Sequence, residues 1–394
     1  MTDRLYYDHT EMKEFDAVVT SIRTNEDGTA EVALDRSAFY PTSGGQPFDT
    51  GEITYIDQAY PVTDVSVDEN GEVWHKVPCG LQVGFPVHGR IDWERRFDHM
   101  QQHGGEHMLA GCIWEKLGGM TIGLHLGVES SSIDVSFPDG RTRVTPDEIC
   151  MLEETVNRRI QQNDPVRCWF PDAEELKTLP LRKAPTVKEH IRIVAFGDYE
   201  MVACGGTHPA HTGEIGCMRI LSVAPVRGKA RFTFVCGMRT VRLNRAWADA
   251  SEKAAVMLSC PVTELAEATE RLKEKQKEFS DQLKHYRATI YENELHNNVE
   301  TLPGGLRLWM AYEEDGHAEA MTQAVQKLAM EPDGIILAGA SGRIVFARSA
   351  NVTVNMAELM KTVGKGGGKP DFASGAGDAE TLKKASERLC ITLD

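Results

Sequence analysis

The chain has 394 residues, too many for one ordinary domain, so we expect two or three domains. Hydrophobic residues make up 41% of the chain and charged residues 26%, which excludes a disordered chain and indicates a globular protein. The formal net charge of −16 counts against nucleic-acid binding over the whole surface, because phosphate contacts need Lys and Arg.

The sequence shows neither a membrane span nor a secretion signal. Apolar runs stay too short to cross a bilayer, and the N-terminal stretch MTDRLYYDHTEMKEF is charged and has no apolar core. The nine cysteines are an odd number without a C-x-x-C pair, which argues for reduced thiols rather than disulfides. We therefore expect a cytoplasmic protein with no membrane partner.

The first half of the chain is predicted to hold two domains. Residues 1–92 contain short alternating runs separated by Asn-Gly, Asp-Gly and Gly-Gly turn signals, a pattern typical of a small β-barrel. Residues 93–240 mix helices and strands. The segment RRFDHMQQHGGEHMLAGCIWEKLG has helical spacing, and IRIVAFG, EIGCMRILSVAPV and RFTFVCGM read as strands. We expect an α+β domain here, with helices packed on an antiparallel sheet.

The second half is predicted to hold a helical arm over 241–300 and an α/β domain over 301–394. Apolar residues of the arm repeat every seven residues, in one series at Leu265, Leu272, Phe279 and Tyr286 and in a second at Leu283 and Ile290. This spacing favours a helical hairpin or coiled-coil arm, and a helix packed on its own body is the alternative. Strand-like and helix-like segments alternate after residue 301, so the fold class of the whole chain is α+β multidomain.

One stretch departs from the acidic character of the chain. Between Arg219 and Arg245 there are seven basic residues and no Asp or Glu. Arg227, Lys229 and Arg231 lie at its centre and are candidates for contacts to an RNA backbone. A solvated basic surface is the alternative.

Two pairs of residues have spacings that suit a metal ion. His103 and His107 are four residues apart on a predicted helix, so their imidazoles share one face. Cys204 and His208 lie in CGGTH, where two glycines permit a tight turn. Three imidazoles and one thiolate form a ligand set that suits Zn²⁺, and one zinc per chain is expected. Glu106 precedes the second histidine instead of following the first as in H-E-x-x-H, which disfavours a zinc peptidase and makes Glu106 a supporting or surface residue.

Four motifs resemble one known family. AFYPTSGGQPFDTG, VGFPVHGRIDWERRFDHMQQHGGEHMLAG and CGGTHPAHTGEIG resemble the editing region of alanyl-tRNA synthetase and, more closely, the free-standing alanyl-tRNA editing proteins called AlaX. GKGGGKPDFASGAG resembles the glycine-rich motif of the synthetase's C-terminal tRNA-binding domain, the DHHA1 type. The motifs stand in the family's order and cover nearly the whole chain, as in a large form of AlaX.

The resemblance implies a function. It makes His103, His107, Cys204 and His208 the zinc ligands and catalytic centre of a hydrolase that deacylates Ser-tRNA or Gly-tRNA bearing the alanine acceptor stem. Because the family's activation domain would precede the barrel, no ATP chemistry or aminoacylation is expected. Where the family usually reads H-T-A-x-H this chain reads HGGEH, so Gly104 lacks a threonine side chain that helps to shape the substrate pocket.

Further residues are expected to contact the substrate or the tRNA. Gln46 and Thr207 are candidates for the substrate pocket, with a barrel turn and a turn cap as their respective alternatives, and Arg96 is a candidate beside them. The glycine-rich motif is expected to bring backbone amides close to phosphates, with a simple flexible loop as the alternative. The candidates in this motif are Lys365, Gly366, Gly367, Gly368 and Lys369.

Two other functions and one assembly remain open. The chain could be a tRNA-binding protein with a structural zinc and no catalysis, or, as a minor alternative, a zinc peptidase. The helical arm or the C-terminal domain could also mediate a homodimer.

Overall fold

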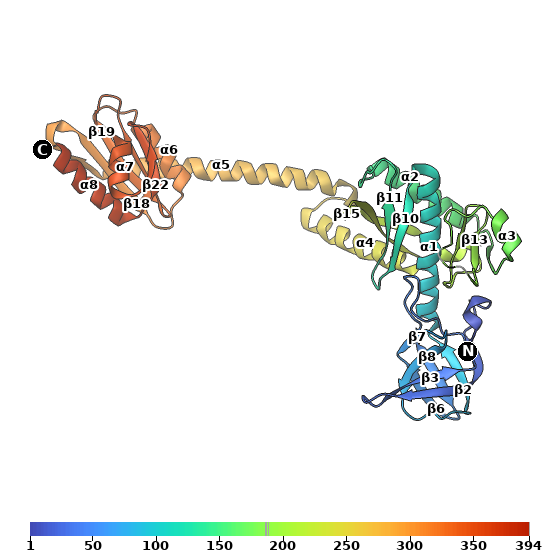
Figure 1. Cartoon of the computed structure of the whole chain (residues 1–394). Coiled ribbons are helices and arrows are strands. Elements are labelled where there is room, and N and C mark those ends of the chain that lie inside the picture. Colours follow the sequence, from blue (N-terminus) through green and yellow to red (C-terminus); the bar gives the residue numbers. More distant parts are fainter. Residues whose placement is uncertain (186, 188, 394) are drawn as a thin grey trace. The chain divides into compact units, whose positions relative to one another are not determined.

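The computed structural model describes residues 1–185, 187 and 189–393 and divides the chain into two compact units, Met1–Ala250 and Ser251–Asp394 (Figure 1). The boundary between the units falls inside the predicted helical segment 241–300. Among the described residues, no helix is both long and apolar enough to cross a membrane. The expected α+β multidomain fold is confirmed.

The first unit begins with the expected barrel. Seven antiparallel strands form one sheet in the order β6-β5-β9-β2-β3-β8-β7. Their bounds are β2 Glu14–Thr24, β3 Thr29–Leu34, β5 Gly51–Tyr55, β6 Gln58–Val62, β7 Asp64–Val67, β8 Val73–Pro78 and β9 Pro86–Ile91. The two edge strands follow each other directly along the chain, and the amide of Thr63 between them donates to the carbonyl of Lys76. The sheet therefore comes close to closing on itself around an apolar core that includes Val32, Leu34 and Ile53.

A short N-terminal segment lies against the barrel. Strand β1 (Asp3–Arg4) pairs in parallel with β4 (Arg36–Ser37), and a short helical turn over Leu5–Tyr7 follows β1.

The second part of this unit places helices on an antiparallel sheet, as predicted. Helix α1 (Trp93–Leu117) packs against the sheet β10-β11-β16-β15 and against helix α2 (Pro146–Gln161). The strand bounds are β10 Met120–Leu126, β11 Ser131–Ser136, β15 Met218–Val226 and β16 Lys229–Cys236. Helix α2 begins with a capping box between Thr145 and Glu148, the start that its sequence indicates.

A smaller three-stranded sheet completes this unit. Its strand order is β12-β13-β14. Of these three strands, the sequence predicted only the one in IRIVAFG. The bounds are β12 Val166–Trp169, β13 Ile193–Phe196 and β14 Glu200–Ala203, with α3 at Ala173–Thr178 and a helical turn at Thr212–Ile215. The last helix, α4 (Met238–Leu258), crosses the unit boundary.

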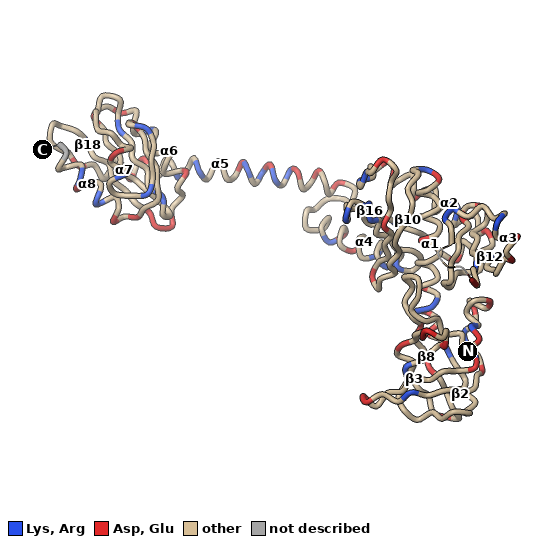
Figure 2. Tube along the Cα trace, in the orientation of Figure 1, with Lys and Arg blue, Asp and Glu red and all other residues tan. Residues whose placement is uncertain are grey.

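The second unit begins with a long helix. After a turn over Val262–Glu264, α5 runs over Leu265–Asn297 without interruption. Acidic and basic residues alternate along it (Figure 2). Most of the predicted heptad positions are exposed: Leu272, Phe279, Leu283, Tyr286 and Ile290 have between 52% and 67% of their surface accessible. In this unit, α5 therefore leaves most of its apolar seam uncovered.

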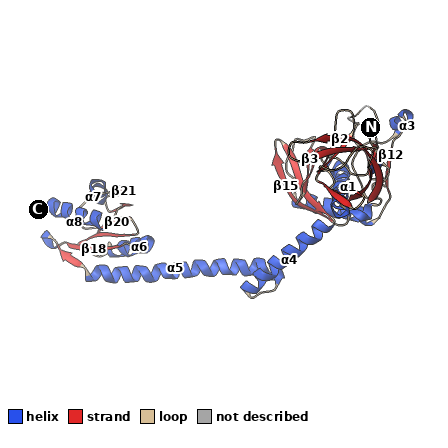
Figure 3. Cartoon of the chain, turned by 90° about the horizontal axis from the view of Figure 1, so that it is seen from below, coloured by secondary structure: helices blue, strands red, loops and turns tan. Residues whose placement is uncertain are grey.

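A six-stranded sheet with helices on both faces forms the rest of the second unit (Figure 3). Its order is β17-β18-β19-β20-β22-β21, and only the pair β18 and β19 is parallel. The strands are β17 Val299–Thr301, β18 Arg307–Glu313, β19 Gly334–Ala340, β20 Arg343–Arg348, β21 Lys365–Gly368 and β22 Phe372–Ala376, and a helical turn lies at Pro303–Gly305. One core joins α5 and α6 (Ala318–Leu328) to one face, and a second joins α7 (Met356–Val363) and α8 (Ala379–Leu393) to the other.

Candidate metal centre

Helix α1 positions two of the four predicted metal ligands. The side chain of Asp92 caps the start of the helix by accepting from the amide of Arg95, and Gly118 ends it in the left-handed conformation with a φ of 67°. His103 and His107 lie on one face of the helix, with their ring centroids 4.9 Å apart and their planes within 16° of parallel. Cys204 and His208 come from the loop that follows β14, and the ring of His208 lies 4.6 Å from that of His103.

The four side chains have the spacing of a tetrahedral site. One ligand atom from each of His103, His107, Cys204 and His208 lies within 4.8 Å of the others. Sγ of Cys204 is 3.5 Å from Nε2 of His103 and 3.6 Å from Nε2 of His208. A tetrahedral Zn²⁺ with bonds of about 2.3 Å to sulfur and about 2.0 Å to nitrogen would separate these atoms by roughly 3.5 Å. The residues present therefore fit one zinc ion.

The electrostatics of the cluster also suit a cation. Both ring nitrogens of His107 and Nδ1 of His208 are buried and have no hydrogen-bond partner among the described residues. Burial lowers the pKa of His103 to about 3 and that of His107 and His208 well below its ordinary value, so the rings are neutral and each has a free lone pair. Burial also raises the pKa of the Cys204 thiol to about 12, a cost that a bound metal removes because it favours the thiolate.

Gln46 orients one of the ligands. Its Oε1 lies 2.8 Å from Nδ1 of His103 and also accepts from the amide of Thr207, while its Nε2 donates to the hydroxyl of Thr207 at 2.8 Å. With the proton on Nδ1, Nε2 of His103 is free to bind the metal. Gln46 and Thr207 are both completely buried. The structure therefore brings the two predicted residues together behind the ligands.

Arg192, which sequence reasoning missed, holds the ligand loop in place. Its guanidinium is buried and donates to the carbonyls of Cys204 and Gly206 at 3.1 and 2.9 Å. The same side chain donates to the carbonyl of Tyr7 in the N-terminal segment. Arg192 lies 12 residues before Cys204 and belongs to no recognisable motif, so its contacts could not be predicted from the sequence.

A cavity of about 240 Å³ opens beside the cluster. Its lining includes His103, His107 and Cys204 together with Glu106, Thr121 and Arg182. Arg182 donates to both carboxylate oxygens of Glu200 and to the hydroxyl of Thr121. The sequence predicted Glu106 as either a supporting residue of the site or a surface residue. The surface alternative is wrong, because Glu106 is only 6% exposed. Burial raises the pKa of this carboxyl to about 7.

Two of the predicted substrate-contacting residues face elsewhere. Arg96 is fully buried, where it pairs with Asp49 and donates to the carbonyls of Thr10 and Ala38. Its contacts join α1 to the barrel, and the prediction that Arg96 contacts substrate is corrected accordingly. Gly104 points toward Ile215, since an added Cβ would lie 3.0 Å from that side chain and outside the lining of the cavity.

Most of the arginines in the basic stretch are paired with carboxylates, which the sequence does not indicate. Arg231 donates two hydrogen bonds to the carboxylate of Asp134 in an ion pair. The prediction that Arg231 contacts an RNA backbone is corrected, because its charge is already paired. Arg219, Arg239, Arg242 and Arg245 are also paired with carboxylates, most of them from distant segments. Arg227 and Lys229 flank the turn between β15 and β16, with φ values of 48° at Arg227 and 76° at Gly228. For these two residues the contact to an RNA backbone stays a prediction.

The glycine-rich motif lies in the other unit. Lys365–Gly368 forms the edge strand β21 and pairs with β22. The alternative of a simple flexible loop is therefore wrong, because β22 fixes the backbone of the motif. Lys365 and Lys369 are both exposed.

Comparison with known proteins gives three family matches. Residues 2–95 match the model for class II (A) tRNA synthetases, residues 191–231 the threonyl and alanyl tRNA synthetase second additional domain, and residues 305–392 the DHHA1 domain. The second match contains Cys204 and His208, and the third contains the glycine-rich motif.

Similar proteins include several alanine–tRNA ligases. The ligase of Pyrococcus furiosus is 33% identical over 98% of this chain, and that of Pyrococcus abyssi is 32% identical over the same share. The ligase of Halobacterium salinarum is 36% identical over 68% of this chain. The chain spans about 43% of the length of the two Pyrococcus ligases. Among solved structures, exonuclease RecJ bound to manganese shares 13% identity over 34% of this chain with a TM-score of 0.24.

Proposed function

We propose that this AlaX-like chain, a relative of the alanine–tRNA ligases that also carries their editing-type and DHHA1 domains, is a zinc-dependent hydrolase that removes wrongly attached serine or glycine from alanine tRNA. The observation that carries the proposal is the cluster of three neutral imidazoles and one thiol beside a cavity, in the unit that contains the editing-type match. His103, His107, Cys204 and His208 would hold the zinc.

A bound zinc would supply Lewis-acid chemistry, polarising the ester or lowering the pKa of a water. The protein supports this chemistry by fixing the ligands. Gln46 and Thr207 set the ring of His103, and Arg192 sets the loop of Cys204. These are positioning residues, since both Gln46 and Thr207 are buried away from the cavity lining.

The cavity suits a small aminoacyl ester. Its volume of about 240 Å³ is below the usual range of about 300–1,000 Å³ for drug-sized ligands, and its polar lining includes Thr121, Glu106 and Arg182. A hydroxyl-bearing side chain finds hydrogen-bonding partners there, whereas one extra methylene alone gives only about 1–3 kcal/mol of discrimination. Recognition of serine by its hydroxyl is therefore the specificity that the site supports best.

The tRNA is proposed to contact both units. Arg227 and Lys229 would contact the acceptor stem near the editing site, and the glycine-rich strand with Lys365 and Lys369 would contact the tRNA through the second unit. The exposed apolar seam of α5 supports a homodimer through this helix, because five large hydrophobic side chains at heptad spacing favour burial against a second copy.

The deciding experiment is deacylation of alanine tRNA charged with Ser, Gly or Ala, with the zinc content measured in the same sample. We expect loss of Ser or Gly with Ala spared. His103→Ala and Cys204→Ala should abolish the activity, and activity within tenfold of the native chain would contradict the ligand assignment.

The second candidate, a tRNA-binding protein with a structural zinc, is favoured by the four protein ligands, which can fill a tetrahedral site. Chelation distinguishes the two. A structural zinc would hold the fold, so that metal removal unfolds the first unit. If the zinc is catalytic, its removal by a chelator should abolish the activity and leave the circular dichroism spectrum unchanged.

A further inference from the structure

One carboxylate faces the cavity beside the proposed metal ligands. Glu106 lies on α1 between His103 and His107, and its side chain is almost fully buried. It belongs to the lining of the cavity, so the small part that stays accessible faces the cavity. A carboxylate so far removed from water is costly unless a donor or a cation pairs with it.

The chain itself supplies no hydrogen bond to this carboxylate. Among the residues that the structure describes, none donates to either oxygen of Glu106. The ring of the adjacent His107 is close, but its Nδ1 lies 3.6 Å from Oε2 of Glu106, which is too far for a hydrogen bond. The oxygens of Glu106 are therefore free to accept hydrogen bonds from a group inside the cavity.

The two cations of the cavity lining are engaged elsewhere or exposed. Nε of Arg182 donates to both carboxylate oxygens of Glu200, at 2.7 and 2.9 Å, and both side chains of this pair are buried. Nη1 of Arg182 donates to the hydroxyl of Thr121, which holds the arginine in this arrangement. Lys183 is exposed. The charge of Arg182 is thus matched by Glu200, and Glu106 has no counter-charge of its own.

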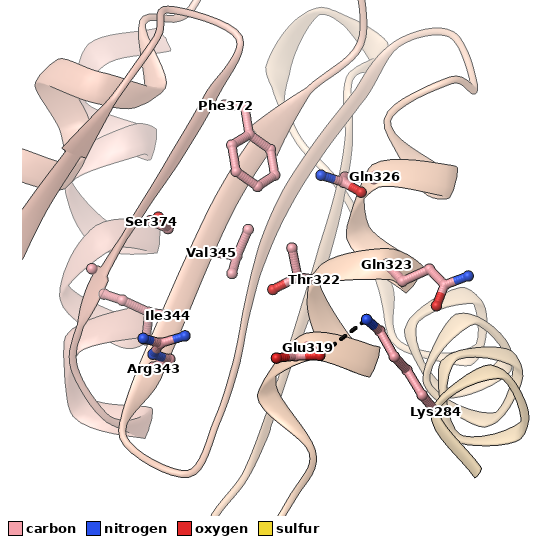
Figure 4. A pocket seen from close by; sticks show the side chains of 11 residues that line it. Lys284, Glu319, Thr322, Gln323, Gln326, Arg343, Ile344, Val345, Phe372 and Ser374 are labelled. Atoms are coloured by element: carbon pink, nitrogen blue, oxygen red, sulfur yellow. Dashed lines mark hydrogen bonds and ion pairs between the residues drawn. The ribbon is translucent and has the colours of Figure 1, made fainter. Parts of the chain in front are cut away.

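A pocket in the second unit shows the contrasting arrangement (Figure 4). Its volume is about 740 Å³, and its wall also contains a carboxylate, that of Glu319 on α6. There Nζ of Lys284 on α5 lies 3.0 Å from Oε2 of Glu319 and pairs with it. The acid of that pocket has its cation within the chain, whereas the acid beside the proposed metal ligands requires one from a ligand.

We infer that Glu106 binds the α-ammonium group of the aminoacyl ester and so restricts the cavity to acyl groups with a free, charged α-amine. The inference rests on the proposed function, which makes an aminoacyl ester the substrate. An ammonium group has three N–H donors and the charge that the carboxylate lacks. It is attached to the carbon next to the ester carbonyl, so a carboxylate adjacent to His107 can hold it while the ester lies beside the ligand cluster.

This contact separates classes of acyl group, not individual amino acids. Serine, glycine and alanine all carry the α-ammonium, so Glu106 would bind each of them and leave the distinction between them to the rest of the cavity. An N-acylated amino acid or an α-hydroxy acid has no such charge. Its ester would leave the buried carboxylate without a partner, which weakens binding.

The test uses two non-hydrolysable ligands that differ only at the α-position. One is 3′-amino-3′-deoxyadenosine with L-serine in amide linkage, and the other carries L-glyceric acid, in which a hydroxyl replaces the ammonium. Calorimetry with the zinc-loaded full chain should show about tenfold to a hundredfold tighter binding of the serine ligand, the range for a hydrogen bond between charged groups.

Two variants assign this preference to a residue. Glu106→Gln keeps the size of the side chain and removes its charge, so the two ligands should then bind within about threefold of each other. Glu94→Gln removes a carboxylate from the same helix, where the side chain is 88% exposed, and should keep the native preference. Both variants should bind as much zinc as the native chain.

The outcomes separate this inference from the proposed function. If the native chain binds the two ligands within twofold, or if Glu106→Gln keeps the native preference, the ammonium contact is wrong even where Ser-tRNA is deacylated. Loss of zinc from Glu106→Gln would show that the carboxylate supports His107 instead and would also overturn the inference. If the native chain deacylates no charged tRNA but its preference for the serine ligand depends on Glu106, the editing function is wrong and the contact stands. Failure to bind either ligand would overturn both proposals.

Discussion

Nδ1 of His103 lies 2.8 Å from Oε1 of Gln46, so a residue of the barrel domain holds the Nδ1 proton of a proposed metal ligand on helix α1. The contact joins two segments that are 57 residues apart, and Thr207 extends it to the loop of the other ligand pair. Because Nδ1 donates to the amide oxygen, Nε2 points to the thiol of Cys204. In the proposed metal centre, the barrel would therefore position a ligand in addition to packing against helix α1.

Replacing Gln46 with Met should weaken zinc binding while leaving the fold intact. The change keeps the volume but removes the acceptor for His103, and the loss of such an outer hydrogen bond typically costs about 10-fold to 100-fold in metal affinity. Competition with a chromophoric chelator measures the affinity. Gln58→Met on the exposed strand β6 is the control, and an affinity of Gln46→Met within twofold of this control would contradict the role given to Gln46.

The ion pair of Arg96 and Asp49 should hold helix α1 to the barrel. Both side chains are completely buried, so Arg96→Met leaves a carboxylate without its partner and should lower the free energy of unfolding by about 3–5 kcal/mol. Pairing Arg96→Met with Asp49→Leu should recover part of this loss, because no charge then remains buried. Urea unfolding measures both.

The exposed pair of Arg90 and Glu52, 2.8 Å apart, provides the control. Its loss should change the free energy of unfolding by no more than about 1 kcal/mol. If Arg96→Met lowers the free energy of unfolding by no more than this control does, the buried pair does not hold helix α1 to the barrel.

The contrast between local and distant contacts explains what the sequence could predict. The spacing of His103 and His107 follows from helix geometry alone, and Cys204 and His208 lie in one short loop, so each of the two pairs could be predicted, and the structure brings the pairs together. Arg231 appears free in the sequence because Asp134 is 97 residues away, and Arg192 has no motif of its own. Such pairings depend on which strands become neighbours, which local patterns do not determine.

The glycine-rich motif shows a second limit. The sequence leaves a flexible loop open as the alternative for GKGGGKP, yet four of its residues form strand β21. The reason is that β22 contributes small residues, Ser374 and Gly375, against which a strand without side chains packs closely. A partner strand of this kind offsets the low strand propensity of glycine, and composition alone does not show it.

His75 should make the barrel sensitive to acid. The imidazole is fully buried, its Nδ1 donates to the carbonyl of Val32 at 2.9 Å, and its Nε2 accepts from the hydroxyl of Ser37 at 2.7 Å. Burial lowers the pKa of His75 from its ordinary 6.5 to about 4. The unfolded chain therefore takes up a proton before the folded chain does as the pH falls. Stability present above pH 6.5 should be lost toward pH 4, by about 3 kcal/mol.

Hydrogen exchange of strands β3 and β8 at pH 7.5 and pH 4.5 measures this effect. His75→Gln should lower the pH dependence by the part that His75 contributes, whereas His125→Gln, at an exposed position, should leave it in place. Equal pH dependence in the native chain and in His75→Gln would rule His75 out as its source.

A chain that ends at Leu258 should keep the metal centre and lose tRNA affinity. Among the residues that the structure describes, the cores of the barrel and of the editing-type domain contain none beyond Cys236, and the cores of the second unit begin at Ala288, so each unit has apolar cores of its own. Ending after α4 keeps that helix whole.

The shortened chain should bind one zinc and deacylate an acceptor-stem minihelix within about twofold of the full chain, because every proposed ligand and every residue of the cavity lining lies before Leu258. Its affinity for whole alanine tRNA should fall by roughly tenfold or more, since the cations around the glycine-rich strand are gone. Unchanged affinity for tRNA would mean that the second unit has a different role, and loss of zinc would mean that the first unit depends on it to fold.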